Sequence, residues 1–391
     1  MQTRQYRLTQ DAAAWAAIPG SELPDAQLVL AFGPSPDGAG GMPDAAWFDA
    51  LAARWPRAAC VYCSTGGHVA GTELVDGAVV VTAVRFAHTG VRAVAAHLPA
   101  GDDGRALGAA LAAGLPRDDL RHVLVFAQAF HVNGHAFVRG LAAETPPGVR
   151  VSGGFAGDDE RLARTVVMYG APAAGGAEPV AGVAIGLYGD RLEVGAGALG
   201  GWEIFGPDRL VTRSERETTG SLVHELDGEP ALALYRRYLG PLAAELPASG
   251  LLFPLALRTR DADTGVVRMV MGIDDEAQAV RFAGEVPEGM YVRLMKASPD
   301  RLIDGASEAA ALAGGGGEAG GPALALVVSC VGRRWVLRQR TEEELEAVRD
   351  ALGATTCLAG FYSYGEVAPA EAGARCDFHN QTMTLTTFRE R

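Results

Sequence analysis

The first half of the chain alternates short apolar runs with longer segments in which apolar residues recur at helical spacing. Short apolar runs are typical of buried strands, and the helical spacing is typical of helices that cover a sheet. The predicted strands are residues 27–32, 58–62, 77–86, 91–97, 122–126, 149–152, 165–169, 180–188 and 192–198, and the predicted helices are residues 43–55, 104–115 and 134–144. This rhythm predicts an α/β fold with a parallel core. We expect residues 77–86 and 91–97 to form an antiparallel hairpin across a Thr-Gly turn, which makes the sheet mixed.

The second half resumes the alternation after a change near Gly201. The predicted strands are residues 210–213, 221–226, 251–257, 266–272, 324–331, 358–364 and 381–388, and the predicted helices start at Glu229 and cover residues 299–313 and 342–352. Residues 314–321 are glycine-rich, and we expect them to form a flexible loop because glycine loses the most entropy on ordering. We therefore predict an α/β protein of two domains with mixed β-sheets flanked by helices. The predicted divisions are a lead-in at residues 1–26, an N-terminal domain at 27–201 and a C-terminal domain at 202–391.

Length, composition and charge narrow the classes of function. A chain of 391 residues is long enough for two domains, and 48% hydrophobic with 21% charged residues is typical of globular proteins. The net charge of −13 would repel a phosphate backbone, so we exclude nucleic acid as a partner. The first twenty residues lack the apolar core of a secretory signal, and the apolar runs are too short to span a membrane. We expect a cytoplasmic protein without a membrane partner.

Cysteine and histidine spacings point to no metal site. Five cysteines are an odd and sparse set that suits a reducing compartment. Cys60 and Cys63 have C-x-x-C spacing, but they lie in an apolar strand pattern without a second pair, so we favour a structural role. His131 and His135 are four residues apart, but an Asn-Gly pair between them breaks a continuous helix, and no third ligand is near.

Four glycine-rich or polar segments lie at or beside the ends of predicted strands. They are Cys-Ser-Thr-Gly-Gly at 63–67, Ser-Gly-Gly-Phe-Ala-Gly-Asp at 152–158, Gly-Phe-Tyr-Ser-Tyr-Gly-Glu at 360–366 and Phe-His-Asn-Gln-Thr at 378–382. Glycine lets the backbone approach a ligand closely or adopt a positive φ, and the exposed N–H groups could hold a carboxylate. A plain turn has the same sequence, so both interpretations remain open.

Together these four segments resemble the FIST family, in which an N-terminal FIST domain precedes a C-terminal FIST domain. The resemblance extends from about Gln27 to the end of the chain and is most specific over residues 360–382. It implies an intracellular sensory protein in signal transduction that binds a small ligand, such as an amino acid or a similar metabolite. It also implies a separate signalling partner, such as a histidine kinase or a cyclic-dinucleotide enzyme. Some members resemble haem-dependent nitric oxide sensors, so haem is the one possible cofactor.

We expect all four segments to contribute to the ligand site. The candidate ligand-binding residues are Cys63, Ser64, Thr65, Gly66, Ser152, Gly153, Gly154, Phe155, Gly157, Asp158, Phe361, Tyr362, Tyr364, Gly365, Glu366, His379, Asn380 and Thr382. Asp158 and Glu366 follow glycines at strand ends, where a carboxylate could hold an ammonium or cap a turn by accepting backbone N–H groups. His379 could be an axial ligand of haem or a structural histidine.

The two halves contain similar segments. Residues 154–158 and 360–366 both begin with Gly-Phe and end with a glycine followed by an acid. We infer a cryptic duplication in which the two Gly-acid turns lie on facing domain edges and hold one ligand between them. Chance similarity between glycine-rich turns is the alternative.

An enzymatic alternative is a Cys-dependent hydrolase or transferase. Cys63 would be the nucleophile, and the Gly66-Gly67 backbone would form an oxyanion hole. No histidine is fixed as the base, because His68 is adjacent in sequence but points along the chain, and no catalytic signature surrounds either residue. We therefore expect a binding protein without catalysis.

Overall fold

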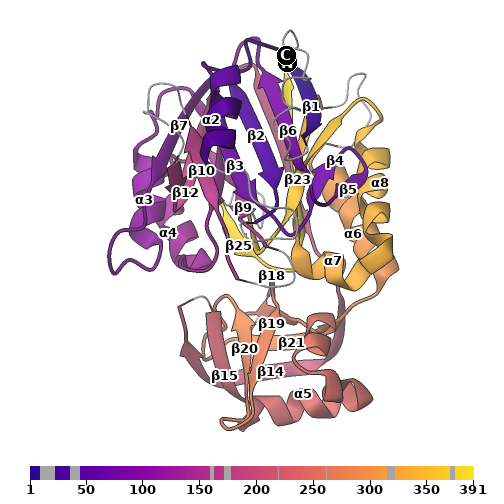
Figure 1. Ribbon diagram of the computed structural model, residues 1–391. Coiled ribbons are helices and arrows are strands. Elements are labelled where there is room, and N and C mark those ends of the chain that lie inside the picture. Colours follow the sequence, from indigo (N-terminus) through magenta and orange to yellow (C-terminus); the bar gives the residue numbers. More distant parts are fainter. Residues whose placement is uncertain are drawn as a thin grey trace.

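The computed structural model describes residues 1–8, 23–35, 45–158, 163–170, 178–218, 220–260, 262–314, 322–369 and 375–391. The chain forms a larger body of three six-stranded sheets with helices on their outer faces, and a smaller domain of residues 203–296 that lies below it in Figure 1. The predicted α/β class with mixed sheets flanked by helices is confirmed. Apart from Gly314, the predicted glycine-rich loop lies outside the described residues.

The three sheets of the body have the same strand order. In the first sheet the order is β1 (Gln2–Leu8), β6 (Val79–Arg85), β2 (Leu28–Gly33), β3 (Ala59–Ser64), β10 (Val167–Gly170) and β11 (Glu178–Val180). In the second it is β7 (Gly90–Ala96), β12 (Gly182–Tyr188), β8 (Leu120–Ala127), β9 (Arg150–Phe155), β24 (Gly365–Ala368) and β25 (Asp377–His379). In the third it is β13 (Leu192–Leu199), β26 (Met383–Glu390), β22 (Leu324–Cys330), β23 (Cys357–Ser363), β4 (His68–Ala70) and β5 (Glu73–Val75).

Among the described strands of the body, each sheet has one parallel pair at its centre, and the other pairings are antiparallel. The parallel pairs are β2–β3, β8–β9 and β22–β23. After each pair the chain crosses to another sheet: β4 pairs with β23, β10 with β3, and β24 with β9. The sheets therefore exchange strands in a cycle. The internal repeat occurs three times, whereas the sequence had led us to infer two copies.

The predicted hairpin of residues 77–86 and 91–97 is wrong. Strand β6 pairs with β1 on one edge and β2 on the other, whereas β7 pairs with β12 in the second sheet. The residues of β6 from Val79 to Val84 are buried, as expected of a central strand. Both of its hydrogen-bonding edges are occupied, so the chain that follows must pair elsewhere.

The inner faces of the three sheets meet in one hydrophobic core. Three phenylalanines lie at its centre, Phe32 from β2, Phe126 from β8 and Phe361 from β23, and all are almost fully buried. The ring of Phe32 lies 4.8 Å from that of Phe361 and 5.9 Å from that of Phe126, centroid to centroid. Such contacts add to the stabilisation from burial. This core joins residues from both ends of the sequence.

Helices cover the outer face of each sheet and form three further cores. They are α2 (Ala45–Arg54) on the first sheet, α3 (Arg105–Ala113) and α4 (Gly134–Glu144) on the second, and α6 (Pro299–Leu312), α7 (Val331–Leu337), η3 (Arg338–Arg340) and α8 (Thr341–Leu352) beside the third. The predicted helices agree with these bounds to within a few residues, but α7 was not predicted. Within the described segments, no helix combines the length and apolarity needed to cross a bilayer.

The small domain is an antiparallel sheet with one α-helix packed on it. Its elements are β14 (Glu203–Arg216), β15 (Gly220–Leu226), β16 (Glu229–Pro230), α5 (Ala231–Leu239), η1 (Gly240–Glu245), η2 (Ala248–Leu252), β17 (Leu255–Arg258), β18 (Asp263–Arg268), β19 (Val270–Asp274), β20 (Ala279–Ala283) and β21 (Tyr291–Lys296). The helix buries Leu232, Leu234 and Tyr235 in the core of this domain.

The small domain is an insertion in the body, which differs from the predicted division near Gly201 into two consecutive halves. Strand β13 precedes the insertion, yet it pairs with β26 at the end of the chain. The boundary does coincide with a change of unit, because β14 begins at Glu203. The return to the body after Lys296 has no comparable signal in the sequence.

Candidate functional site

The predicted glycine-rich segments come together where the central strands of the three sheets end. The N–H of Gly157 donates to the carbonyl of Ser64 at 2.8 Å, and the N–H of Gly66 donates to the carbonyl of Tyr362 at 2.8 Å. The N–H of Tyr364 donates to the carbonyl of Phe155 at 3.3 Å. These bonds join all three repeats through their backbones.

Two of the predicted glycines are required by close packing within the protein. A Cβ on Gly157 would lie 2.7 Å from the nitrogen of Gly66 and 2.8 Å from the oxygen of Tyr362, so the three strand ends can meet only without it. A Cβ on Gly365 would clash with the ring of Phe378. At both positions the glycine makes room for another part of the protein. This is a structural role, which the sequence left open as the alternative to ligand contact.

Asp158 caps a turn. Its side chain is fully buried, and its Oδ2 accepts backbone N–H groups of Ala163 and Arg164, each at 3.0 Å. Nearby, the hydroxyl of Ser64 donates to the carbonyl of Gly157 at 2.9 Å and accepts from the N–H of Val166 at 2.8 Å. These contacts hold the loop that follows β9 against the end of β3.

Glu366 is a buried carboxyl with neutral donors around it. Its Oε1 accepts from the hydroxyl of Ser363 at 2.7 Å, and its Oε2 accepts from the hydroxyl of Thr382 at 2.8 Å and from the N–H of the same residue at 3.2 Å. Burial raises the pKa of Glu366 to about 8, against the opposing effect of these three donors. It therefore binds its proton at neutral pH.

His379 and Asn380 are also buried. The Nε2–H of His379 donates to the carbonyl of Ala368 at 3.0 Å, and burial lowers the pKa of this imidazole, which keeps it neutral. Neither polar atom of the Asn380 amide has a hydrogen-bond partner in the part of the chain that the structure describes. Buried amides of this kind are rare, because the missing bonds cost free energy.

The remaining predicted residues lie inside the body. Cys63 and Phe361 belong to the central core, and burial raises the pKa of the Cys63 thiol far above its usual range. The hydroxyl of Tyr362 donates to Glu344 at 2.7 Å. The Thr386 hydroxyl donates to that of Ser152 at 2.6 Å.

Three further candidates are packed against the protein itself. Thr65 is hydrogen-bonded to the Nδ1 of His68, and both residues are buried. Gly153 and Gly154 lie within strand β9 rather than in a turn. A Cβ on Gly153 would clash with the carbonyl of Val125 in β8, so a larger residue would separate this parallel pair.

A cavity of about 290 Å³ lies between the body and the small domain. Its walls are apolar or aromatic side chains with glycine and proline. They are Ala129, Phe130, Val132, Gly134, Phe155, Val331, Trp335, Tyr364 and Phe378 from the body, and Pro247, Ala248, Leu251, Met269, Val270, Met271 and Ala283 from the small domain. Of the predicted site residues, Phe155 and Tyr364 line it.

Aromatic pairs shape the body side of the cavity. The rings of Phe130 and Tyr364 lie 5.7 Å apart and those of Phe155 and Phe378 5.4 Å apart, both in T-shaped geometry. Gly134 brings Phe378 close to helix α4, because a Cβ at this glycine would clash with the ring. Phe378 therefore packs between Gly134 and Gly365, which connects the predicted Gly-Glu turn with the cavity wall.

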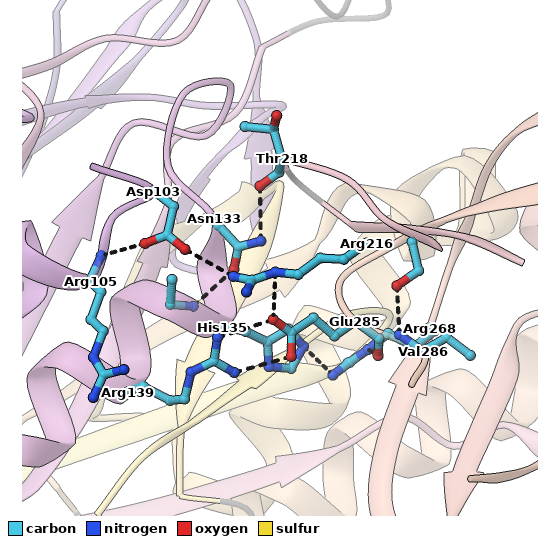
Figure 2. A network of polar contacts seen from close by, with 12 residues as sticks. Asp103, Arg105, Asn133, His135, Arg139, Arg216, Thr218, Arg268, Glu285 and Val286 are labelled. Atoms are coloured by element: carbon cyan, nitrogen blue, oxygen red, sulfur yellow. Dashed lines mark hydrogen bonds and ion pairs between the residues drawn. The ribbon is translucent and has the colours of Figure 1, made fainter. Parts of the chain in front are cut away.

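A network of polar contacts joins the body to the small domain beside this cavity (Figure 2). Arg139 of helix α4 forms two hydrogen bonds with the carboxylate of Glu285, each of 3.1 Å. Arg216 reaches the same carboxylate at 3.2 Å and that of Asp103 at 2.9 Å. The amide of Asn133 donates to the carbonyl of Thr218 at 2.8 Å. These contacts connect helix α4 and its N-cap residue with the end of β14 and with the loops that follow β14 and β20.

Arg268 is the centre of the buried part of this network (Figure 2). It is 1% exposed, and its Nε donates to the carbonyl of Glu285 at 3.0 Å. Its Nη1 donates to the carbonyl of Val267 at 2.9 Å, and its Nη2 donates to the Nε2 of His135. Burial and the neighbouring Arg268 hold the pKa of His135 well below its usual range, so His135 accepts this bond as a neutral imidazole.

The histidine pair considered for a metal is divided by this arrangement. His131 is exposed, whereas His135 contacts Arg268. The described residues contain no group of three or more His, Cys, Asp or Glu side chains placed to hold a metal ion. Sequence analysis missed Arg268, Trp335 and Met269, because an isolated arginine or apolar residue in a strand or helix pattern carries no signal of its position beside a cavity.

Two family models match the chain. Residues 27–229 match the FIST N domain and residues 231–369 match the FIST C domain, which confirms the resemblance found in the sequence. Among solved structures, the cyanuric acid hydrolase from A. caulinodans is similar over 100% of this chain and 99% of its own, with 10% sequence identity and a TM-score of 0.38. No curated protein matches the chain.

Proposed function

Because the chain belongs to the FIST family, we propose that it is a sensory protein that binds a small ligand in the cavity between its body and its small domain. The observation that carries this proposal is that residues of both parts form the wall of one cavity of about 290 Å³. Cavities at domain interfaces are common sites for small ligands. A ligand that contacts both parts can change how the small domain sits on the body.

The polar network beside the cavity supports a route for the signal. Gly134 lines the cavity, and the neighbouring residues Asn133 and His135 bond to the small domain. Ala283 lines it from the other side, two residues before Glu285. Displacement of these cavity walls would therefore alter the contacts that hold the two parts together. We propose that a separate signalling protein, such as a histidine kinase or a cyclic-dinucleotide enzyme, reads this change.

His379 is poorly placed to hold haem iron in the cavity. His379, the predicted axial ligand, does not line the cavity, and its Nε2–H is bonded to the carbonyl of Ala368. Its side chain is 2% exposed. Ligation of iron through Nε2 would require this histidine of β25 to break its bond to Ala368 in the paired strand β24. We therefore propose an organic ligand.

The proposal does not include catalysis. A thiolate, not a thiol, is the nucleophile in cysteine enzymes. Cys63 is fully buried, and its raised pKa keeps it as a thiol at neutral pH. All five cysteines are unpaired, which supports the proposed location in the reducing cytoplasm.

A thermal-shift screen tests the proposal. A ligand that binds only the folded protein raises its melting temperature, and the rise grows with the logarithm of the ligand concentration above the dissociation constant. We expect small apolar compounds to raise the melting temperature of the wild type and to have no effect on Ala283→Trp, in which the indole fills the cavity. Leu312→Trp, on an exposed residue of α6, is the matched control and keeps the response. Compounds that stabilise all three proteins equally would place the site elsewhere and contradict the proposal.

A further inference from the structure

We propose that the cavity takes an uncharged, largely aromatic molecule and rejects free amino acids, an inference that rests on the function proposed above. Its walls are hydrocarbon and aromatic surface from Phe155, Trp335, Phe378 and Leu251, together with the thioethers of Met269 and Met271. None of the described lining residues carries a charge. An ion that enters such a site loses its hydration and finds no counterion, which costs several kcal/mol.

The buried guanidinium of Arg268 is not available to a ligand carboxylate. Its central carbon lies 5.9 Å from the centre of the ring of Phe378, which lines the cavity. Four of its five N–H groups already donate to protein acceptors, to the carbonyls of Glu285, Val267 and Phe378 and to His135. Arg268 is 1% exposed and does not line the cavity, so a ligand carboxylate in the cavity does not contact it.

The carboxylates predicted to hold an ammonium are also occupied by protein donors. Asp158 binds the backbone N–H groups of Ala163 and Arg164, and Glu366 binds Ser363 and Thr382. Neither acid lines the cavity. The two charged groups of an amino acid therefore have no partners on this wall.

The size and the wall chemistry favour an aromatic ring. A volume of about 290 Å³ is at the small end of ligand cavities and equals that of on the order of ten water molecules. Phe130, Phe155 and Phe378 offer ring edges and faces, which bind a further ring in stacked or T-shaped geometry. The thioethers of Met269 and Met271 also make favourable contacts with aromatic rings, and their flexible side chains adapt to its outline.

A matched series of compounds tests the charge preference. The probes are 4-ethylphenol, tyramine, 4-hydroxyphenylacetate and tyrosine, which share one ring and differ in charge. Titration calorimetry of the full chain at neutral pH gives the dissociation constant of each. We expect 4-ethylphenol to bind, and the ammonium, the carboxylate and the zwitterion each to bind at least about 100-fold more weakly.

Two tryptophan variants locate the binding. Met271 is 46% exposed at the edge of the cavity, so Met271→Trp should fold while it obstructs the site. Ile204 is 48% exposed in the same domain and does not line the cavity, so Ile204→Trp is the matched control. We expect Met271→Trp to weaken the binding of 4-ethylphenol at least tenfold and Ile204→Trp to leave it unchanged.

The outcomes separate this inference from the proposed function. If tyrosine or either singly charged probe binds as tightly as 4-ethylphenol, and Met271→Trp weakens it, the cavity is a ligand site but the inference about charge is wrong. If no probe binds at millimolar concentration, or if both variants bind all probes like the wild type, the inference and the cavity as a ligand site both fail.

Discussion

The buried carboxyl of Glu366 makes the stability of the protein depend on pH in a direction opposite to that of most acidic residues. Desolvation favours the protonated form, so the folded protein holds this proton up to a pH of about 8, whereas the ordinary pKa is 4.5. Between these two values the folded protein binds one more proton at this site than the unfolded chain. Glu366 therefore contributes its full stabilisation of the folded protein below pH 4.5, and this stabilisation is lost as the pH rises through the folded-state pKa of about 8.

The size of the effect follows from the two pKa values. Each pH unit within this window lowers the free energy of unfolding by about 1.4 kcal/mol. From 4.5 to about 8 the loss is about 5 kcal/mol, as an order of magnitude. Glu366→Gln replaces the carboxyl with a neutral group of the same shape, so it removes the pH-dependent part.

Urea unfolding of the wild type and of Glu366→Gln at pH 6 and pH 8 measures the difference. We expect the wild type to lose about 2 kcal/mol more than the variant over these two pH units, because the carboxyl is already half ionised at pH 8. Glu346→Gln, on an exposed residue of helix α8, is the control and should follow the wild type. If the stabilities of wild type and Glu366→Gln change in parallel with pH, Glu366 is ionised throughout and the argument from burial is refuted.

Three further predictions test other parts of the structure. Gly153→Ala should lower the free energy of unfolding by about 3 kcal/mol or more, because φ is +137° and the Cβ would clash with β8. Gly148→Ala, where φ is +82° and the space is open, should lower it by about 1 kcal/mol. Equal losses in urea unfolding would contradict this. Glu285→Gln should lower the free energy of unfolding by about 1 kcal/mol in low salt and by less in 1 M salt, because its arginine partners are half exposed. A loss that does not depend on salt would be inconsistent with an ionic network. Cys60 and Cys63 should react with a thiol reagent only after unfolding, since both are fully buried and burial raises the pKa of Cys60 to about 12. Rapid labelling of the folded protein, measured by mass spectrometry, would show that this strand opens.

Local patterns predicted much of the secondary structure. The apolar runs that became β2, β8 and β22 and the helix α4 are clear in the sequence, because their residues are buried in sheets or on one helix face. The exchange of strands between sheets could not be predicted. Pairings such as that of β13 with β26 join distant segments, and a strand pattern does not name its partner.

The candidate site was predicted in part. The glycine-rich segments do converge, because their glycines permit contacts such as that between Gly157 and Gly66. Only Phe155 and Tyr364 of the predicted residues line the cavity. Seven of the other lining residues belong to the small domain, and the sequence does not show where that domain lies on the body. Met269 has the local sequence of a buried strand residue, and only tertiary structure places it beside a cavity.

An anomalous difference map from a crystal of the full chain soaked with 4-bromophenol tests the central claim most directly. We predict one dominant bromine peak between Phe155 of the body and Met269 of the small domain, inside the cavity. Bromine peaks confined to other surfaces, with this cavity empty at a saturating concentration of the compound, would contradict the proposal that the two parts of the protein hold a ligand between them.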